Sequence, residues 1–370
     1  MRILLVRLRL IGDVVLTTPL LRALKRRYPE AQLTYLVEPA AAPIVRGNPH
    51  LSEVMLVPRR RGVARLRDDL AIARQLRQQR FDVAIDLHGG PRAAWFTWAS
   101  GAPVRIGYAV KGRSRLYTRV VARTADEAPR AAVANQWDLL APLDIAPPDP
   151  ARDALEMAED PQAAASVERR LRDAHISAAH PLIVVHVSAG NPFRRWPRES
   201  FEALVIALAR RDPLRRIILT SGPSDAPAAA AISDRARAAL GPLAAGVPDI
   251  GEFDLAELRA LVARAAVYIG GDSGPLHIAG TTTTPIVALL GPTLAERSMP
   301  WRDRRWFAEA VDAGPLECRP CRQRECAPGD FRCLTHITAD QVAAAAERAL
   351  KGSGLIPSHE MSPDPVTRSV

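Results

Sequence analysis

Four stretches of this 370-residue chain place small and polar residues directly after an apolar run, where their side chains could do chemistry. The densest is GGDSGPLHIAG at 270–280. Ser273 and Pro275 are typical of a helix start, whose free N–H groups attract anions such as phosphate. His277 follows Ser273 by about one helical turn, so both can face one ligand, and Asp272 suits a sugar or ribose hydroxyl. The stretch indicates a phosphate-type ligand, with a plain capped helix as the alternative.

The stretch LRLIGDVVLTTP at 8–19 combines a glycine with an acid. Gly12 lets the backbone turn tightly, and Asp13 opens the helix that follows. A carboxylate in that position could accept a proton as a general base. The alternative is that Asp13 is only the N-cap of the helix, a position where acids are common. A helix N-terminus favours the ionised form, so such a base would be strongest once a cleft closes and excludes water.

The stretch AIDLHGGPR at 84–92 ends another apolar run and supplies Asp86, His88 and Arg92. A histidine in this position serves either a ligand or a structural hydrogen bond. Shortly afterwards, the segment 104–119 is dense in Lys and Arg, with Arg113 near its centre. Such density suits the binding of phosphates or carboxylates, although a solvated loop would have the same composition.

The fourth stretch, VVHVSAGNPFRRWP at 184–197, brings Ser188 and then Arg194 and Arg195 after a buried strand. Small residues allow a ligand to approach the backbone closely, and a guanidinium can hold a phosphate through a forked pair of hydrogen bonds. A nearby stretch, LTSGPSDAP at 219–227, ends a further strand and places Asp225 at a helix start.

The elements that must position these residues alternate along the chain. Apolar patterns predict strands at 2–8, 32–37, 54–57, 83–88, 181–187, 215–220, 265–269 and 285–289, and helices at 14–28, 64–79, 91–99, 162–174, 198–210, 225–239 and 254–264. This alternation predicts an α/β fold of parallel sheets covered by helices, which bind ligands at the carboxyl ends of their strands. We expect two domains, 1–175 and 176–351, joined near the Pro- and Asp-rich segment 144–153, and a disordered tail at 352–370.

Positive charge is concentrated in the first part of the chain. Residues 1–150 contain 24 Lys and Arg against 13 Asp and Glu, a net charge of +11, whereas residues 151–370 carry a net charge of −1. This asymmetry indicates an anionic partner of the first half, which could be nucleic acid, a membrane surface or a polyanionic substrate. An arginine-rich genome that decorates a solvated surface is the alternative.

The sequence also excludes several classes of protein. Arg7, Arg9 and Asp13 interrupt the N-terminal apolar stretch, which favours a buried strand over a signal peptide. No segment has the roughly 18 to 20 uninterrupted apolar residues that a membrane span needs, so we expect a cytoplasmic protein. Neither a G-x-G-x-x-G nor a Walker pattern is present, which argues against an NAD enzyme and a P-loop NTPase.

All four cysteines fall within 16 residues, in the spacing C-x2-C-x4-C-x6-C. In a cytoplasmic protein such spacing favours a structural metal over disulfides. The hypothesis is a zinc site, with reduced packing thiols and a redox pair as the alternatives. Its candidate ligands are Cys318, Cys321, Cys326 and Cys333.

Taken together, the motifs resemble glycosyltransferase family 9, the heptosyltransferases of lipopolysaccharide core assembly. The resemblance rests on RLRLIGDVVLTTPLLRALKRRYPEAQLTYLV, IDLHGG, VRIGY, RRWP and GGDSGPLHIAG followed by TPIVALLGPT, in the order and spacing of the family from residue 1 to about 345. It implies the GT-B architecture, in which two Rossmann-like domains face each other across a cleft. The N-terminal domain would bind the acceptor and the C-terminal domain an ADP-heptose donor.

The resemblance also assigns roles to particular residues. The catalytic base falls on Asp13, and the family's phosphate-binding lysine is replaced by Arg194, which keeps the charge and changes the geometry. Asp225 falls near the position of a ribose-binding acid that is Glu in many relatives. The remaining donor-binding residues would be Ser188, Arg195, Asp272, Ser273, Gly274 and His277. Acceptor-binding residues would be Gly12, Asp86, His88, Arg92 and Arg113.

The implied reaction is one direct displacement that inverts the anomeric carbon and needs no cofactor or metal at the reaction centre. The partners would be an ADP-sugar and an anionic acceptor of the Kdo–lipid A type at the cytoplasmic face of the inner membrane, with no nucleic acid. The enzyme would be a monomer that associates peripherally with that membrane. Alternatives are a family member with another donor or acceptor, a GT-B nucleotide-sugar epimerase, and a non-catalytic nucleotide- or glycan-binding module.

Overall fold

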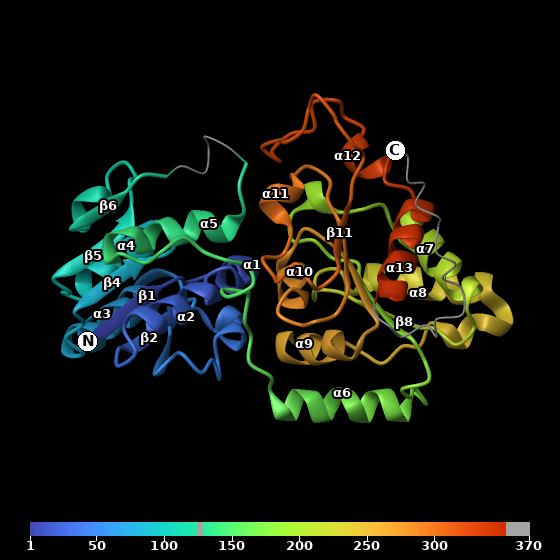
Figure 1. Ribbon diagram of the computed structural model, residues 1–370, viewed down its shortest axis with the longest axis horizontal. Helices are drawn as coiled ribbons and strands as arrows, with labels where there is room; N and C mark the ends of the chain where they lie inside the picture. The colour runs from blue at the N-terminus through green and yellow to red at the C-terminus, as the bar shows by residue number, and fades with distance from the viewer. Residues whose placement is uncertain (124–128, 353–370) are drawn as a thin grey trace, which may run out of the picture.

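The computed structural model describes residues 1–123 and 129–352, whose strands form two parallel sheets (Figure 1). The first sheet has the order β3-β2-β1-β4-β5-β6 and the second the order β11-β10-β9-β7-β8. The first sheet comprises β1 (Arg2–Val6), β2 (Gln32–Val37), β3 (Glu53–Leu56), β4 (Val83–Asp86), β5 (Val104–Tyr108) and β6 (Arg119–Val121). The second comprises β7 (Leu182–His186), β8 (Arg216–Thr220), β9 (Val267–Gly271), β10 (Ile286–Leu289) and β11 (Ala308–Val311).

Both strand orders are doubly wound. The first is the order of the Rossmann fold, and the second, counted from β7, is the flavodoxin-like order 2-1-3-4-5. In such sheets the order in which successive strands are added reverses at one point. The loops that follow the two strands on either side of this point form a crevice for ligands. Here those points lie between β1 and β4 and between β7 and β9. The four stretches singled out in the sequence are found at the carboxyl ends of these four strands. The predicted α/β class with two Rossmann-like units is confirmed.

Helices cover both faces of each sheet, because alternate strand residues point to opposite sides. In β1, Ile3 and Leu5 join one apolar cluster, and Leu4 and Val6 join another. The helices of the first unit are α1 (Ile11–Val15), α2 (Thr18–Arg27), α3 (Gly62–Gln78), α4 (Pro91–Ala99) and α5 (Ala132–Trp137), with 3₁₀ segments η1 (Pro39–Ile44), η2 (Ser114–Leu116) and η4 (Asp138–Leu143). The later helices are α6 (Pro161–Asp173), α7 (Arg198–Arg211), α8 (Ala226–Leu240), α9 (Leu255–Arg264), α10 (Gly274–Ala279), α11 (Ala295–Ser298), α12 (Arg332–Thr335) and α13 (Ala339–Gly352), with η5 (Pro192–Arg194) and η6 (Gly241–Gly246).

The single helix expected at 14–28 is divided into α1 and α2. Pro19 has no N–H to continue the hydrogen-bond ladder through this region. Instead, the hydroxyls of Thr17 and Thr18 donate to the carbonyls of Val14 and Val15 at 2.7 and 2.8 Å. The expected elements do not include β5, β6, β11 or α13. The first three are short strands, two of them with arginine, so they show little of the alternation that identifies a strand.

The segment that connects the two units is bound to both. The backbone N–H of Glu156 donates to Thr18 Oγ1 at 2.9 Å, and Arg26 pairs with the buried Asp153 at 2.8 Å. On the other side, the Trp301 indole donates to the Asp153 carbonyl at 3.0 Å. Arg259 of α9 then donates to the Met157 carbonyl at 3.0 Å. The connection is therefore bound to both units, and we call residues 153–162, which include the first residues of α6, the strap.

Helix α6 continues from this strap and packs against α9. Arg170 reaches Glu257 at 3.1 Å, and Arg264 pairs with Glu168 at 2.5 Å. This helix precedes the predicted domain boundary at 175, whose position stays a prediction. Of the tail predicted at 352–370, Gly352 is the last residue of α13, and residues 353–370 lie outside the described residues. Within 1–123 and 129–352, no helix is both long and apolar enough to cross a bilayer.

One histidine lies inside the second sheet. His186 ends β7, is buried, and bonds through Nδ1 to Thr220 Oγ1 at 3.0 Å. Burial lowers the pKa of His186 from 6.5 to about 4. Below pH 6.5 the His186 ring becomes protonated in the unfolded chain, whereas in the folded protein it stays neutral down to about pH 4. The free energy of unfolding therefore decreases as the pH falls from 6.5 to about 4.

We therefore expect the wild-type protein to lose about 2 kcal/mol more unfolding free energy than His186→Asn between pH 7 and pH 5, because each pKa unit corresponds to about 1.4 kcal/mol. Guanidinium unfolding at both pH values measures this difference. The exposed His175→Asn serves as a control that keeps the wild-type dependence. Equal losses in wild type and His186→Asn would contradict the expectation.

Candidate active site

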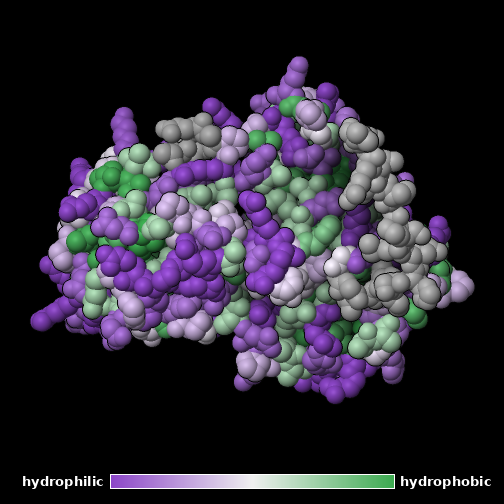
Figure 2. Space-filling view, in the orientation of Figure 1, coloured by the Kyte–Doolittle hydropathy of each residue, from purple (hydrophilic) through white to green (hydrophobic). Residues whose placement is uncertain are grey.

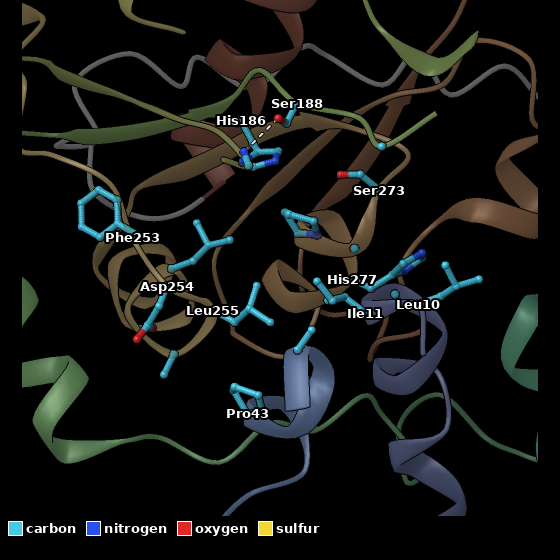
Figure 3. Close-up of a pocket in the computed structure, with 18 of the residues that line it drawn as sticks. Leu10, Ile11, Pro43, His186, Ser188, Phe253, Asp254, Leu255, Ser273 and His277 are labelled. Carbon is cyan, nitrogen blue, oxygen red and sulfur yellow. Dashed lines mark hydrogen bonds between the residues drawn. The ribbon is translucent and has the colours of Figure 1, made fainter. Parts of the chain in front are cut away.

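A cleft of about 1790 Å³ separates the facing ends of the two sheets (Figure 3). Its walls come from three parts of the chain: the β1–α1 loop and η1, the strap at 158–162, and the loops after β7, β8 and β9 together with the start of α9. The predicted residues that line it are Gly12, Asp13, Ser188, Arg194, Asp225, Asp272, Ser273, Gly274 and His277. The cleft thus gathers residues from both units and from the segment between them.

Asp13 is held in place by an arginine. Its Oδ2 forms an ion pair with Arg7, which in turn donates to the Leu87 carbonyl at 2.5 Å. The Asp13 side chain is one-third exposed, and its Oδ1 accepts no hydrogen bond from the described residues. The N-cap of α1 is Leu10, with a φ of 69°, and Asp13 makes no capping bond. The interpretation of Asp13 as a simple N-cap is therefore wrong, and one of its carboxylate oxygens is free to accept a proton.

Two glycines bring the units into contact at the cleft. A Cβ on Gly274 would lie 2.9 Å from Ile11 Cγ2 and 3.1 Å from the Gly12 nitrogen. A Cβ on Gly12 would lie 3.1 Å from His277 Cδ2. Helices α1 and α10 therefore touch through backbone, which holds Asp13 against the loop after β9.

The loop after β9 contains two buried polar atoms without a partner. Ser273 is the N-cap residue of α10, yet its hydroxyl makes no capping bond, and its Oγ and the Nδ1 of His277 have no partner among the described residues. The expected capping role of the Ser273 hydroxyl is therefore not observed. Burial lowers the pKa of His277, and the nearby carboxylates of Asp272 and Asp13 oppose this shift. Buried polar atoms are costly when unpaired, so these two indicate a ligand.

Arg194 is held from two sides. It lies 3.1 Å from Asp272 Oδ2 and also donates to the Asp272 carbonyl at 3.2 Å. Asp272 is buried and accepts from the hydroxyls of Thr293 and Ser298 at 2.7 and 3.0 Å. Its Oδ2 is thus occupied by protein groups. On the other side, Arg194 Nε donates to Gln323 Oε1 at 2.6 Å.

A second cluster lies where β7 and β8 end. Ser188 Oγ donates to Asp225 Oδ2 at 2.6 Å and accepts from the Gly222 N–H at 2.8 Å. Arg195 reaches Asp225 Oδ1 at 3.3 Å and does not line the cleft. The cluster brings Ser188, Arg195 and Asp225 together, and its hydroxyl and carboxylate face the cavity.

One end of the cleft is apolar. Phe253, Leu255, Pro43 and Ile11 point toward the same space in Figure 3. The guanidinium of Arg170 on α6 lies 5.0 Å from the centroid of the Phe253 ring and supports it from behind. A flat apolar surface beside polar groups suits an aromatic base.

Four of the five residues expected to bind an acceptor do not line the cleft, and two of these, Asp86 and Arg92, are occupied by contacts within the protein. Asp86 is fully buried and accepts from Tyr117 at 2.6 Å and from two backbone N–H groups at 2.8 Å, and burial raises its pKa. Arg92 is bound to Asp69 at 2.5 Å and to the Pro58 carbonyl at 3.0 Å. These contacts are structural, because Asp86 joins the end of β4 to Tyr117, and Arg92 joins α4 to α3 and to the segment after β3. The acceptor-binding role of both residues stays a prediction that this geometry does not support.

His88 and Arg113 each have a nitrogen that is available for a ligand. Each contains one buried nitrogen without a partner among the described residues, Nδ1 in His88 and Nε in Arg113. Burial, together with Arg7 and Arg9, lowers the pKa of His88 to about 4. Neither residue lines the cleft itself. Both belong to the first unit, which also carries Asp13. Their expected role in acceptor binding stays a prediction.

All four cysteines are free, half-buried thiols. Burial, with the other three cysteines nearby, raises the pKa of Cys333 to about 11. Across 1–123 and 129–352, no group of three or more His, Cys, Asp or Glu side chains is arranged to hold a metal ion. The geometry therefore does not support the predicted zinc site.

Several site residues were not anticipated. Gln323 lies between two cysteines in sequence and carries no signal of its own, since only folding brings it to Arg194. The sequence likewise gives no indication that Arg7 pairs with Asp13 or that residues 158–162 line the cleft. His186 could have been found, because a histidine at the end of an otherwise apolar strand is unusual.

Two parallel-sheet units with a cleft between the carboxyl ends of their strands have the GT-B architecture of glycosyltransferases. Residues 70–331 match the model of glycosyltransferase family 9 (heptosyltransferase), so the chain belongs to that family. It is 26% identical to lipopolysaccharide heptosyltransferase 3 of Escherichia coli, over 94% of this chain and 98% of the relative.

Solved structures show the same fold. A family 9 glycosyltransferase from Veillonella parvula DSM 2008 is similar with a TM-score of 0.80 and 22% identity, covering 95% of this chain and 97% of that one. The E. coli heptosyltransferase WaaC with ADP-2-deoxy-2-fluoro heptose is similar with a TM-score of 0.65 and 21% identity, covering 94% and 99%. The predicted family and architecture are confirmed.

The contact between α1 and α10 can be tested with one methyl group. We expect Gly274→Ala to lower the unfolding free energy by about 1–3 kcal/mol, because overpacking a tight contact costs that much. Gly190→Ala is the matched control, since a Cβ there meets nothing within 4 Å. Guanidinium unfolding compares the two, and small-angle scattering measures whether the units separate. A Gly274→Ala protein as stable and as compact as Gly190→Ala would refute the contact.

Proposed function

We propose that the protein is an inverting heptosyltransferase that transfers heptose from ADP-heptose to the Kdo/heptose inner core of lipopolysaccharide. Membership of family 9 and the name of the E. coli relative, lipopolysaccharide heptosyltransferase 3, support this reaction. The solved relative that contains an ADP-heptose analogue supports the donor. The observation that carries the proposal is that Asp13 Oδ1, Ser273 Oγ and His277 Nδ1 line one cleft with no hydrogen-bond partner in 1–123 and 129–352.

On the donor side, the groups around Arg194 would bind the diphosphate. A guanidinium held by Asp272 and Gln323 keeps a fixed position, and the Ser273 hydroxyl is a donor that meets no partner in the part of the chain that the structure describes. Negative charge grows on the diphosphate as the sugar–phosphate bond breaks, and donors already in position stabilise it without reorganisation. Arg195 reaches the site through Asp225, whose carboxylate would accept from a ribose hydroxyl. The apolar end beside Phe253 would hold the adenine ring.

On the acceptor side, Asp13 would act as the general base. Its free oxygen takes the proton of the acceptor hydroxyl, while that hydroxyl oxygen attacks the anomeric carbon from the face opposite the diphosphate. The new C–O bond forms as the bond to the phosphate oxygen breaks, and ADP leaves with the electron pair. One displacement inverts the centre, and its charges are handled by protein groups with no metal at the reaction centre.

We further propose that the unit rich in positive charge faces the acceptor. The net charge of +11 on residues 1–150 favours an anionic lipid-linked acceptor at the cytoplasmic face of the inner membrane. His88 and Arg113, with their unpaired nitrogens, are the side chains beyond Asp13 that would meet it. The protein would act as a monomer of two domains, 1–175 and 176–351, that needs no cofactor.

We expect Asp13→Asn to lower the turnover number about 10²- to 10⁴-fold, with little change in ADP affinity, because the amide cannot accept the proton. Mass spectrometry of products from ADP-heptose and a panel of truncated lipopolysaccharide acceptors measures transfer, and calorimetry measures ADP binding. Asp144→Asn, on an exposed turn of the same unit, is a control that retains activity.

The same experiment separates the other functions. An epimerase would convert ADP-heptose with no acceptor present. A binding module would bind ADP and show no turnover in wild type or variant. No transfer by the wild-type protein to any acceptor in the panel would overturn the proposed donor–acceptor pair.

Gln323 provides a test of the donor site. We expect Gln323→Ala to weaken ADP binding about tenfold, because a hydrogen bond to a charged group contributes about 1.5–3 kcal/mol and Asp272 still holds Arg194 in part. Arg324→Ala, next in the same loop and exposed, is the matched control. Calorimetric titration with ADP that gave equal affinities for both variants would show that Gln323 does not position Arg194.

A further inference from the structure

One helix of the first unit exposes an apolar face. On α3, Val63 is 81% exposed, Leu66 63% and Leu70 49%. These residues recur at intervals of three and four, so they form one stripe along the helix. Other residues of α3, Ile72 and Leu76, are buried and pack in the apolar cluster against the sheet. The exposed stripe is therefore not part of the core.

Arginines share this stripe. Helical periodicity puts Arg67, Arg74 and Arg77 on the same side of α3 as the three aliphatic residues. All three arginines are exposed and form no ion pair with the described residues. We call these six residues, Val63, Leu66, Leu70, Arg67, Arg74 and Arg77, the α3 face. On the left-hand unit as a whole, Figure 2 shows hydrophobic and hydrophilic side chains interleaved over the surface.

No free carboxylate of α3 offsets this charge. Asp68 pairs with Arg60 at 3.1 Å, and Asp69 is buried against Arg92 at 2.5 Å. Both acids are thus neutralised by arginines outside the α3 face. Beyond the end of the helix, Arg80 joins Arg74 and Arg77 in lining a hollow of about 730 Å³. Asp82 also lines this hollow, and its Oδ2 accepts from the Arg2 backbone N–H at 2.6 Å. The six residues of the α3 face themselves are all aliphatic or cationic.

The helix next to α3 adds an aromatic residue. Helix α4 packs against α3 over a shared apolar cluster that contains Ile72, Leu76 and Phe96. Trp98 of α4 is 50% exposed. Tryptophan is enriched where protein meets the interface between lipid and water, because its ring is apolar and its N–H is polar.

We propose that the α3 face docks the protein on a bilayer that contains anionic lipid. The aliphatic side chains enter the boundary between headgroups and acyl chains, and the arginines bind lipid phosphates while their stems cover apolar surface. Charge complementarity selects this partner, because the face presents unpaired guanidinium groups beside large aliphatic side chains and no free acid. The inference rests on the proposed function in one respect, namely that the acceptor is lipid-linked.

Docking along α3 brings the cleft to the bilayer. The carboxyl ends of the parallel strands lie at one edge of the sheet, where the cleft opens. Helix α3 starts after β3, so Val63 and Leu66 lie toward that edge, and the hollow lined by Arg74 and Arg80 lies toward the opposite one. Leu10, 63% exposed, lines the cleft on the same unit. A lipid-linked acceptor would then reach Asp13 without leaving the membrane surface.

Vesicle co-sedimentation of the full chain tests the proposal. We expect binding to phosphatidylcholine vesicles with about one-third phosphatidylglycerol, and little to pure phosphatidylcholine. The triple variant Arg67→Gln/Arg74→Gln/Arg77→Gln should bind about 100-fold more weakly, since each arginine near an anionic surface contributes about fivefold. The triple variant Val63→Ser/Leu66→Ser/Leu70→Ser, which keeps the charge, should lose at least about tenfold.

Two control proteins match these changes. Arg169→Gln/Arg172→Gln/Arg304→Gln removes the same charge from exposed positions elsewhere, and Leu214→Ser removes an exposed aliphatic residue from the second unit. Both should bind vesicles like the wild type. Equal binding by wild type and both α3 variants, or equal losses in the controls, would overturn the proposal. Thermal unfolding at the wild-type temperature shows that the variants are folded.

A pair of acceptors separates this proposal from the proposed function. The α3 variants should transfer heptose to a deacylated, soluble acceptor at the wild-type rate and lose transfer to the same acceptor embedded in vesicles. A wild-type protein that binds anionic vesicles and transfers to neither acceptor would leave docking supported and refute the function. Normal transfer to both acceptors by the α3 variants would refute docking.

Discussion

The site depends on the contact between the backbones of α1 and α10. Gly12 and Gly274 lie so close that a methyl group on either would meet the opposite unit. Only this proximity lets a carboxylate carried by the first sheet lie beside the unpartnered hydroxyl and imidazole carried by the second. The remaining elements of the site arrange groups around that point: Arg7 orients Asp13, and the ion pair with Asp272 orients Arg194.

The two walls of the cleft are prepared in different ways. In the wall formed by the second unit, Asp272 and Gln323 hold Arg194 in position, and Ser273 Oγ and His277 Nδ1 have no partner among the described residues. On the opposite wall, Asp13 has one oxygen bound and one open. The first wall suits a charged group that must be held still, and the second suits a proton that must move. This division matches the proposed reaction, in which the diphosphate of the departing ADP must be held and the acceptor hydroxyl must lose a proton.

Much of this arrangement could be predicted from the sequence. Parallel strands end at one edge, so polar residues after apolar runs had to gather there, and they did for Asp13, Ser188, Arg194 and Asp272. Asp86 and Arg92 share the pattern, yet both bind other side chains of the first unit. The sequence alone does not show whether a polar side chain will find a partner within the protein. Gln323 could not be found at all, since its contact with Arg194 spans 129 positions of the chain.

The strap has a mechanical consequence. It is bonded to α2 on one side and to Trp301 and α9 on the other, and its residues 158–162 also form part of the cleft wall. A hinge placed outside a pocket changes only the width of the opening. Here the segment that joins the units also lines the cleft, so any rotation of one unit against the other reshapes the space beside Phe253. The angle between the units and the volume offered to the ligand are therefore a single variable.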